Sequence, residues 1–235
     1  MSLIEITRKD KEWIKDNYPD LSIQEEAPTK LAGVLKFRAL MKSKLPEIQD
    51  KYQVEIEFVT SPTSSLPQVR DIGGRIERVA QDRSIELSDL HVNPKDGILC
   101  LCSPLEEESP FSNGFNIEEF FSELLIPFFY AQSYFETNDK WPWKHYSHGH
   151  LGILESYAYT KQLDCALTEK CVELLRKQYR KEWELYRRLL DKKDYIKGHW
   201  QCACGSSMKF RMCHYEVLEG LRKLKQDITV CSISV

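Results

Sequence analysis

The feature that most constrains the fold is an apolar stretch in the middle of the chain. Residues 120–135 read FFSELLIPFFYAQSYF and are nearly all apolar. A helix that is apolar around most of its circumference must be buried on several sides. Asn116 suits the N-cap of such a helix, and Glu119 stands at the capping-box spacing from it. We therefore predict a buried core helix from Asn116 onward, with a kink at Pro127.

The chain before this helix has the mixed pattern of an α+β domain. A short charged helix is predicted over residues 7–18, because Pro19 stops it. Strands are predicted over residues 31–37 and 52–60, and the second of these alternates apolar residues with glutamates, as a half-buried strand does. The prolines and serines of residues 61–67 predict a loop.

Length and charge limit the class of protein. A chain of 235 residues corresponds to one or two domains. It contains no run of about 18 apolar residues, so no membrane span is expected. Its first residues lack an apolar signal core, so we expect a cytoplasmic protein. Lys and Arg total 33 against 36 Asp and Glu, and the net charge of −3 argues against nucleic acid as a partner.

A second helical pattern covers residues 168–193, where apolar side chains recur every three or four residues. Residues 176–193 carry eight basic and three acidic side chains, a local charge of +5. We interpret this charge as a solvated helix face. The alternative is a docking surface for an acidic partner or nucleic acid.

The chain has eight cysteines, and without a secretion signal these favour thiols, metal ligands or a nucleophile over disulfides. Residues 200–214 concentrate four N/S ligands, which are Cys202, Cys204, Cys213 and His214. This number suits a closed tetrahedral zinc site. Gly205 permits a tight turn, and the serines after it can direct N–H groups toward the thiolates. Two ligands are adjacent and no helical His-Glu-x-x-His pair is present, so we predict structural zinc and no hydrolytic centre.

The same stretch resembles the SEC-C zinc motif, a small knuckle often appended to bacterial proteins. That motif has Cys-x-Cys, a Gly-Ser-Gly-Lys-Lys-like turn, and then Cys-Cys or Cys-His. Ser207 and Met208 depart from the Gly-Lys part of the turn. The resemblance implies a structural or interaction module that has no reaction of its own.

The central candidate is Cys100, in the stretch HVNPKDGILCLC of residues 91–102. Asn-Pro and Asp-Gly are turn signals, and the residues before Cys100 are apolar. A catalytic thiol needs partial exposure, rigid support and a donor for an oxyanion. Asn93 can supply the donor, and His91 can brace the loop. A buried structural cysteine is the alternative.

This passage resembles the active-site segment of ubiquitin-conjugating enzymes. His91-Val92-Asn93 corresponds to the family's His-Pro-Asn, and residues 97–101, GILCL, correspond to its nucleophile strand. Cys100 then takes the nucleophile position, and Cys102 is an extra thiol. The resemblance covers roughly residues 1–160 and implies an antiparallel meander flanked by helices.

The segment WPWKHYSHGHLGILE, residues 141–155, is similar to the bacterial branch of these enzymes, which occurs in anti-phage operons. Its three histidines, His145, His148 and His150, have no cysteine or carboxylate pattern that would complete a metal site. His148 can assist proton transfer to or from an incoming amine. The alternative, which we favour, is that the Ser-His-Gly turn is structural.

The resemblance predicts three segments: a catalytic domain over residues 1–160, a helical linker over 161–199, and a zinc-binding segment over 200–235. It implies a conjugating enzyme that carries a modifier's C-terminal glycine as a thioester on Cys100 and passes it to an amine. The expected partners are a ubiquitin-like modifier or a CD-NTase nucleotide cyclase, a separate activating enzyme and a protein target.

The setting we favour for this activity is CBASS anti-phage defence, and the alternative is a bacterial ubiquitin-like operon. A non-catalytic interaction protein with the same fold is the rival class. In that reading the fold binds one partner and the zinc knuckle recruits another.

Overall fold

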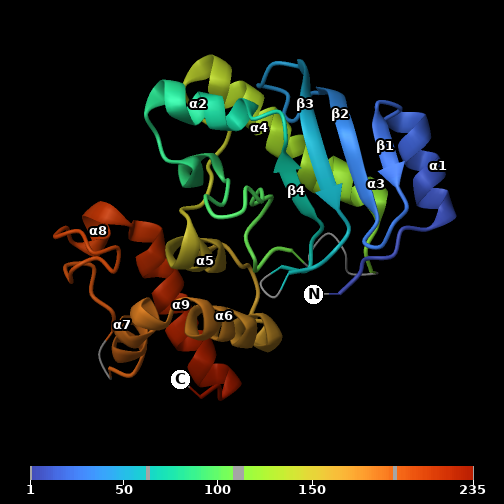
Figure 1. Cartoon of the computed structure of the whole chain (residues 1–235). Coiled ribbons are helices and arrows are strands. Elements are labelled where there is room, and N and C mark those ends of the chain that lie inside the picture. Colours follow the sequence, from blue (N-terminus) through green and yellow to red (C-terminus); the bar gives the residue numbers. More distant parts are fainter. Residues whose placement is uncertain (1, 62–63, 108–113, 193–194, 235) are drawn as a thin grey trace. The chain divides into compact units, whose positions relative to one another are not determined.

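The computed structural model describes residues 2–61, 64–107, 114–192 and 195–234. They belong to two compact units, with bounds Met1–His145 and Tyr146–Val235 (Figure 1). Each unit is described by itself below.

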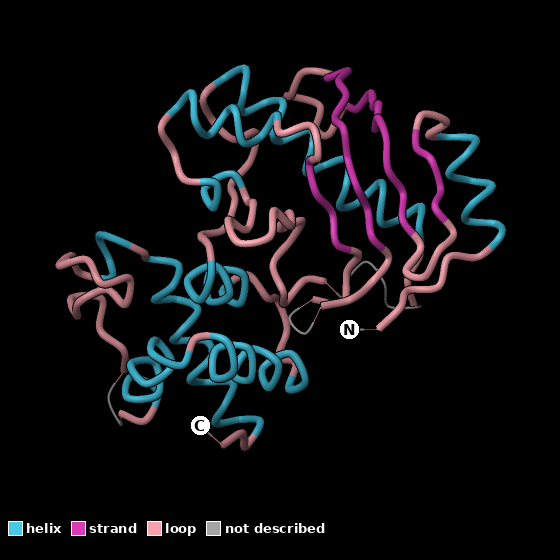
Figure 2. Tube along the Cα trace, in the orientation of Figure 1, coloured by secondary structure: helices cyan, strands magenta, loops and turns pink. Residues whose placement is uncertain are grey.

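The described part of the first unit is α+β, with four strands in one antiparallel sheet of order β1-β2-β3-β4 (Figure 2). The strands are β1 (Leu21–Gln24), β2 (Lys30–Ala39), β3 (Ile48–Glu57) and β4 (Gln68–Asp71). Strands β2 and β3 pair along their whole length, from Lys30 opposite Glu57 to Ala39 opposite Ile48. Both predicted strands are therefore present, although β3 begins and ends earlier than expected.

The helical elements of the first unit are α1 (Arg8–Asn17), α2 (Arg75–Arg83), η1 (Leu87–Leu90), α3 (Ile117–Glu119), η2 (Phe120–Leu125) and α4 (Ile126–Asn138). The prediction of α1 is confirmed, and Thr7 caps it through a reciprocal capping box with Asp10.

The predicted core helix is present and begins where expected. The Asn116 side chain accepts hydrogen bonds from the Glu118 and Glu119 amides at 2.9 and 3.1 Å. The chain is π-helical over η2 and becomes α-helical in α4, which contains Pro127 near its start. Helix α4 packs on β2 and β3, and the Phe129 ring lies 4.5 Å from that of Tyr52. The change of winding comes just before the proline, and the kink expected at Pro127 stays a prediction.

The second unit is built around α9. Its helices are α5 (Gly149–Ala158), α6 (Cys165–Gln178), α7 (Arg180–Leu190), α8 (Phe210–Cys213) and α9 (Tyr215–Cys231). Helices α5 and α6 pack on α9. A Cβ at Gly220 would lie 2.0 Å from the Leu154 carbonyl oxygen, so only glycine permits this approach of α5 and α9. The helix predicted over residues 168–193 is two helices, because the chain breaks at Tyr179.

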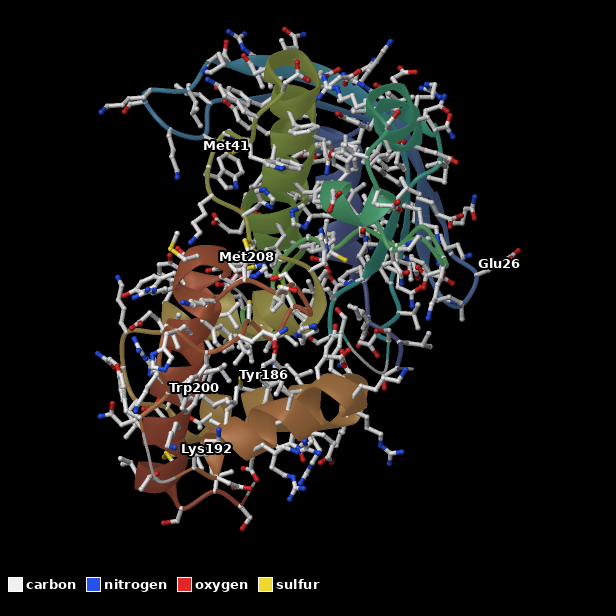
Figure 3. All side chains as sticks on the ribbon, turned by 90° about the vertical axis from the view of Figure 1, so that its left-hand side faces the viewer. Glu26, Met41, Tyr186, Lys192, Trp200 and Met208 are labelled. Carbon is white, nitrogen blue, oxygen red and sulfur yellow. A yellow bond between two sulfur atoms is a disulfide. The ribbon has the colours of Figure 1, made fainter. Side chains whose placement is uncertain are left out.

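The bounds of this unit differ from the segment boundaries that were expected after residues 160 and 199. The stretch predicted as a linker contains α6 and α7, which bury Leu175, Trp183 and Tyr186. Lys192 Nζ lies 4.3 Å from the centre of the Trp200 ring, across the second expected boundary (Figure 3). The described residues between 161 and 199 are therefore part of a packed unit together with the cysteine-rich segment.

The expectation that the cysteines avoid disulfides is wrong for one pair. Cys165, the first residue of α6, is joined to Cys231, the last residue of α9. The two residues are separated by 66 positions, and helix packing brings them together. In the part of the chain that the structure describes, no helix combines the length and hydropathy of a membrane span.

Candidate functional sites

A short antiparallel hairpin positions Cys100. Val92 pairs with Leu99, the Asn93 N–H donates to the Ile98 carbonyl at 2.9 Å, and the Cys100 N–H donates to the His91 carbonyl at 2.8 Å. Alternate residues of paired strands face opposite sides. Val92 and Leu99 are buried, whereas Cys100 is exposed. Asn93 and Cys100 therefore share the outer face of the hairpin.

The turn of this hairpin is held by its own side chains. The Asn93 carboxamide oxygen accepts from the Lys95 N–H at 3.1 Å, and a carboxylate oxygen of Asp96 accepts from the Ile98 N–H at 3.1 Å. Gly97 has φ of +71°, which glycine adopts at little cost. Because the oxygen of the Asn93 side chain serves the turn, its NH2 group is the end that can donate to a bound group.

His91 lies against aromatic rings of the first unit. Its backbone is left-handed, with φ of +58°. Its ring centroid is 5.5 Å from that of Trp141 and 5.2 Å from that of His145. These are the contacts of a residue that supports the hairpin, so the bracing role assigned to His91 has a physical basis in packing. His145 belongs to the same aromatic cluster.

The surroundings of Cys100 disfavour its thiolate. Desolvation of the sulfur and the carboxylates of Asp96 and Glu107 raise the pKa of Cys100 above its ordinary value. Glu107 is buried and accepts from the Ser65 N–H at 2.9 Å and from the Ser65 hydroxyl at 3.2 Å. At neutral pH Cys100 is therefore mainly a neutral thiol. Cys102 is less exposed than Cys100 and packs against the core of the first unit.

The Ser-His-Gly turn has a structural explanation in the second unit. Ser147 donates to the buried Glu155 carboxylate through its N–H at 2.6 Å and its hydroxyl at 2.8 Å. A Cβ at Gly152 would lie 1.8 Å from the Ser147 carbonyl oxygen. His148 is the N-cap residue of α5 in this unit, whereas Cys100 belongs to the first. The accessory role of His148 stays a prediction.

His150 likewise has a local partner. Its Nδ1 lies 2.5 Å from the Tyr186 hydroxyl, and desolvation lowers the pKa of His150, so the ring is neutral at pH 7. The expectation that the three histidines do not form a metal site stays a prediction. Within residues 2–61, 64–107, 114–192 and 195–234, the one candidate metal group lies elsewhere.

That group consists of the four ligands predicted from the sequence, namely Cys202, Cys204, Cys213 and His214. Their ligand atoms all lie within 4.8 Å of one another. His214 Nδ1 is 3.3 Å from the sulfur of Cys202 and 3.2 Å from that of Cys213, and the Cys204 and Cys213 sulfurs are 3.5 Å apart. Ligands bound tetrahedrally to zinc are separated by about 3.6–3.8 Å. The cluster could therefore hold a metal ion with small adjustments.

The backbone around the cluster holds the thiols close together and favours ionisation of one of them. The segment around Gln201 pairs with Lys209, and the Cys202 N–H donates to the Met208 carbonyl at 2.8 Å. Gly205 makes the turn with φ of +82°. Burial opposes ionisation of Cys204, but its hydrogen bonds, with those from the Ser206 hydroxyl and N–H first among them, outweigh it and lower the pKa to about 6. The expected role of the serine N–H groups is borne out at Ser206.

The pKa of the neighbouring thiol, Cys202, is shifted in the opposite direction. Burial is the main cause that raises the pKa of Cys202 to about 12, and its proximity to Cys204 adds to it. Burial thus opposes the thiolate at Cys202, whereas hydrogen bonds favour it at Cys204. A bound metal ion would supply positive charge that favours the thiolates.

No protein-family model, curated protein or solved structure matches the chain. The family resemblance seen in the sequence therefore stays a prediction. The Cys100 hairpin and the four-ligand cluster are supported as candidate sites by their geometry.

Proposed function

We propose that the chain is a conjugating enzyme that forms a thioester on Cys100 and transfers the acyl group to an amine. In the first step the Cys100 thiolate attacks the activated C-terminal glycine carbonyl of a modifier and expels the activating group. In the second step an amine, usually of lysine, attacks the thioester and Cys100 leaves as the thiolate. Splitting one acyl transfer into two steps lowers each barrier.

The observation that carries this proposal is the shared face of Cys100 and Asn93. Cys100 is an exposed residue with a partly desolvated sulfur, the hairpin is held by backbone bonds, and the Asn93 NH2 group is the donor end of its side chain. A donor beside the reacting carbonyl stabilises the oxyanion of the tetrahedral intermediate. The fold we propose for the first unit is that of ubiquitin-conjugating enzymes, which its α+β meander supports.

The proposed partners are a modifier that ends in glycine, an activating enzyme and a protein target. The modifier is a CD-NTase nucleotide cyclase in the CBASS setting that we favour, or a ubiquitin-like protein in the other operon type. The setting rests on the sequence resemblance of residues 141–155. The proposed compartment is the cytoplasm.

We also propose that the metal of the second unit is zinc. Three thiolates and one imidazole are the ligands of structural zinc sites, and all four positions come from protein. Such a site holds the segment around Gly205 in shape and supplies no open position for a substrate.

The test uses the full-length, zinc-loaded chain and a peptide with a C-terminal glycyl thioester, which needs no activating enzyme. Intact-mass measurement should find an adduct that a thiol reductant removes on the wild type and on Cys102→Ala. On Cys100→Ala no more than a residual adduct signal should remain. Lysine is then added, and loss of the thioester is timed. Adduct formation confined to Cys102 would contradict the assignment.

The decisive variant is Asn93→Asp. It keeps the oxygen that accepts from the Lys95 N–H and removes the donor. Lysine transfer from the loaded enzyme should fall about 10²–10³-fold. Alkylation of Cys100 by iodoacetamide, compared at equal thiolate fraction, should stay the same. Equal transfer rates for the variant and the wild type would favour the interaction-protein alternative.

A further inference from the structure

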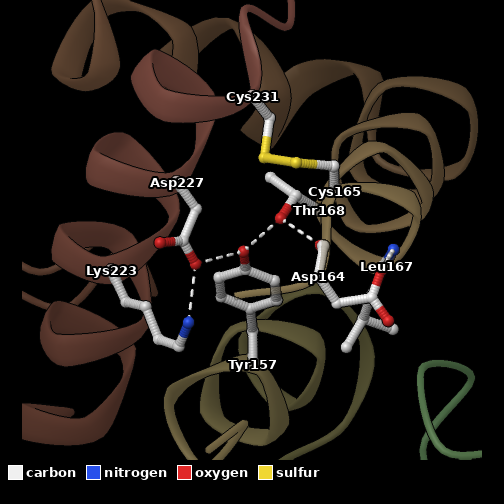
Figure 4. Close-up of a disulfide and its surroundings, with 8 residues drawn as sticks. All are labelled: Tyr157, Asp164, Cys165, Leu167, Thr168, Lys223, Asp227 and Cys231. Carbon is white, nitrogen blue, oxygen red and sulfur yellow. Dashed lines mark hydrogen bonds and ion pairs between the residues drawn. A yellow bond between two sulfur atoms is a disulfide. The ribbon is translucent and has the colours of Figure 1, made fainter. Parts of the chain in front are cut away.

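The disulfide of the second unit joins opposite ends of two helices. Cys165 is the first residue of α6, and Cys231 is the last residue of α9 (Figure 4). This pair lies outside the Cys100 site and outside the four-ligand cluster, so its chemistry is independent of the proposed function.

The two sulfurs experience opposite helix dipoles. The N-terminus of a helix carries partial positive charge and stabilises a thiolate, whereas the C-terminus carries partial negative charge and destabilises one. Asp164 caps α6 by accepting from the Leu167 N–H at 3.1 Å, and its charge offsets part of the effect at Cys165. No basic residue lies in the last turn of α9 to help Cys231. Cys165 is therefore the better leaving group.

The disulfide is also at the surface of its unit. Cys165 is exposed and Cys231 is half-buried. The buried face of α9 ends at Ile228, and Val230 is 61 % exposed. The disulfide therefore lies where α9 leaves the packed part of its unit, and Cys165 is the more exposed of its two residues.

We propose that Cys165–Cys231 is a site of reversible exchange with low-molecular-weight thiols, in which the thiol attacks Cys231 and Cys165 leaves. The attacking thiolate forms a new S–S bond to Cys231, the Cys165–Cys231 bond breaks, and its electron pair stays on Cys165. A second thiol molecule releases the adduct as a small-molecule disulfide and leaves both cysteines reduced. A small-molecule disulfide reverses the sequence, and the Cys165 thiolate closes the bond.

The contacts next to the disulfide keep α9 in place during exchange. The Tyr157 hydroxyl donates to Asp227 at 2.7 Å and lies 2.8 Å from the Thr168 hydroxyl oxygen, and Lys223 pairs with Asp227 at 2.6 Å (Figure 4). These bonds connect α5, α6 and α9 one turn before Cys231. His214 immediately precedes the other end of α9, so exchange at Cys231 should leave the metal cluster intact.

The experiment uses the oxidised, zinc-loaded full-length chain with Cys100→Ala, so that the proposed nucleophile does not contribute. Reduced glutathione is added briefly, free thiols are blocked at low pH with N-ethylmaleimide, and peptides are identified by mass spectrometry. We expect glutathione on Cys231 and maleimide on Cys165 in at least about fivefold excess over the reverse product. Bound zinc should not change.

Single variants give a second measurement. Cys231→Ser leaves the Cys165 thiol, and Cys165→Ser leaves the Cys231 thiol. Iodoacetamide should alkylate Cys165 faster than Cys231 at pH 7, with both variants checked for a native circular dichroism spectrum. The proposal is overturned if glutathione attaches mainly to Cys165, if both sites react equally, or if glutathione disulfide does not re-form the bond in the reduced protein.

Discussion

Removing the Cys165–Cys231 disulfide should destabilise the second unit by about 4 kcal/mol. A cross-link stabilises mainly by restricting the unfolded chain, and the restriction grows with the length of the loop it closes. The loop here spans 66 positions. The chain-entropy relation then gives about 15 cal/mol/K, or about 4 kcal/mol at 25 °C. The perturbation is the double variant Cys165→Ser/Cys231→Ser.

The assay must separate the two units. Urea unfolding of the full-length, zinc-saturated chain is followed by hydrogen-exchange mass spectrometry, which reads peptides of α9 and of the sheet independently. With a slope of about 1.5–2 kcal/mol/M, the midpoint for α9 should fall by about 2–3 M urea. The midpoint for peptides of β2 and β3 should not move, because these strands belong to the other unit.

Wild-type protein reduced with a phosphine is the matched control. If the disulfide acts on the unfolded chain, reduced wild type and double variant should unfold at the same urea concentration, because the bonds of Tyr157 and Asp227 are present in both. An unchanged α9 midpoint in the variant would refute the reasoning. So would a loss in the variant that the reduced wild type does not share, since that loss would come from packing.

Three further outcomes follow from the geometry. Gly220→Ala should lower the stability of the second unit by at least about 1–3 kcal/mol, read as a lower urea midpoint for α9, because its Cβ would meet the Leu154 carbonyl oxygen at 2.0 Å. Cys204→Ser should lose bound metal in elemental analysis while unfolding of the first unit is unaffected, and full metal occupancy would contradict the ligand assignment. Asp96→Asn keeps the turn acceptor and removes a charge that raises the pKa of Cys100, so alkylation should accelerate by up to about fivefold at pH 7 and converge with wild type above that pKa.

Elements held by local signals were predicted well from the sequence. The helix after Asn116 and the strand around Val54 follow from apolar periodicity and capping, which depend on neighbouring residues. The break at Tyr179 was not predicted, because the apolar spacing continues through it and only the backbone turns. The packing of α5 and α6 on α9 was missed for a similar reason: the glycine that permits close approach, Gly220, is an ordinary helix residue until its neighbour is known.

The two candidate sites differ in the same way. The four metal ligands lie within residues 200–214, so a single turn brings them together. Their spacing in the sequence was therefore enough to predict the cluster. Cys165 and Cys231 lie at the ends of different helices, and no spacing rule connects them. Glu107 contributes to the raised pKa of Cys100. Its carboxylate is held by a hydrogen bond from Ser65, which lies 42 residues earlier in the chain. Nothing in the sequence links that carboxylate to the thiol.

The raised pKa of Cys100 slows both steps of the proposed reaction. It lowers the fraction of thiolate available for the first step, and it makes the sulfur a poorer leaving group in the second. The thioester would therefore form slowly without help and then persist. Both effects are reversed by positive charge brought near Asp96 and Glu107, which a cationic surface of a modifier or activating enzyme can supply. A carrier with such a thiol reacts slowly alone and faster in its complex, which suits the proposed conjugating enzyme.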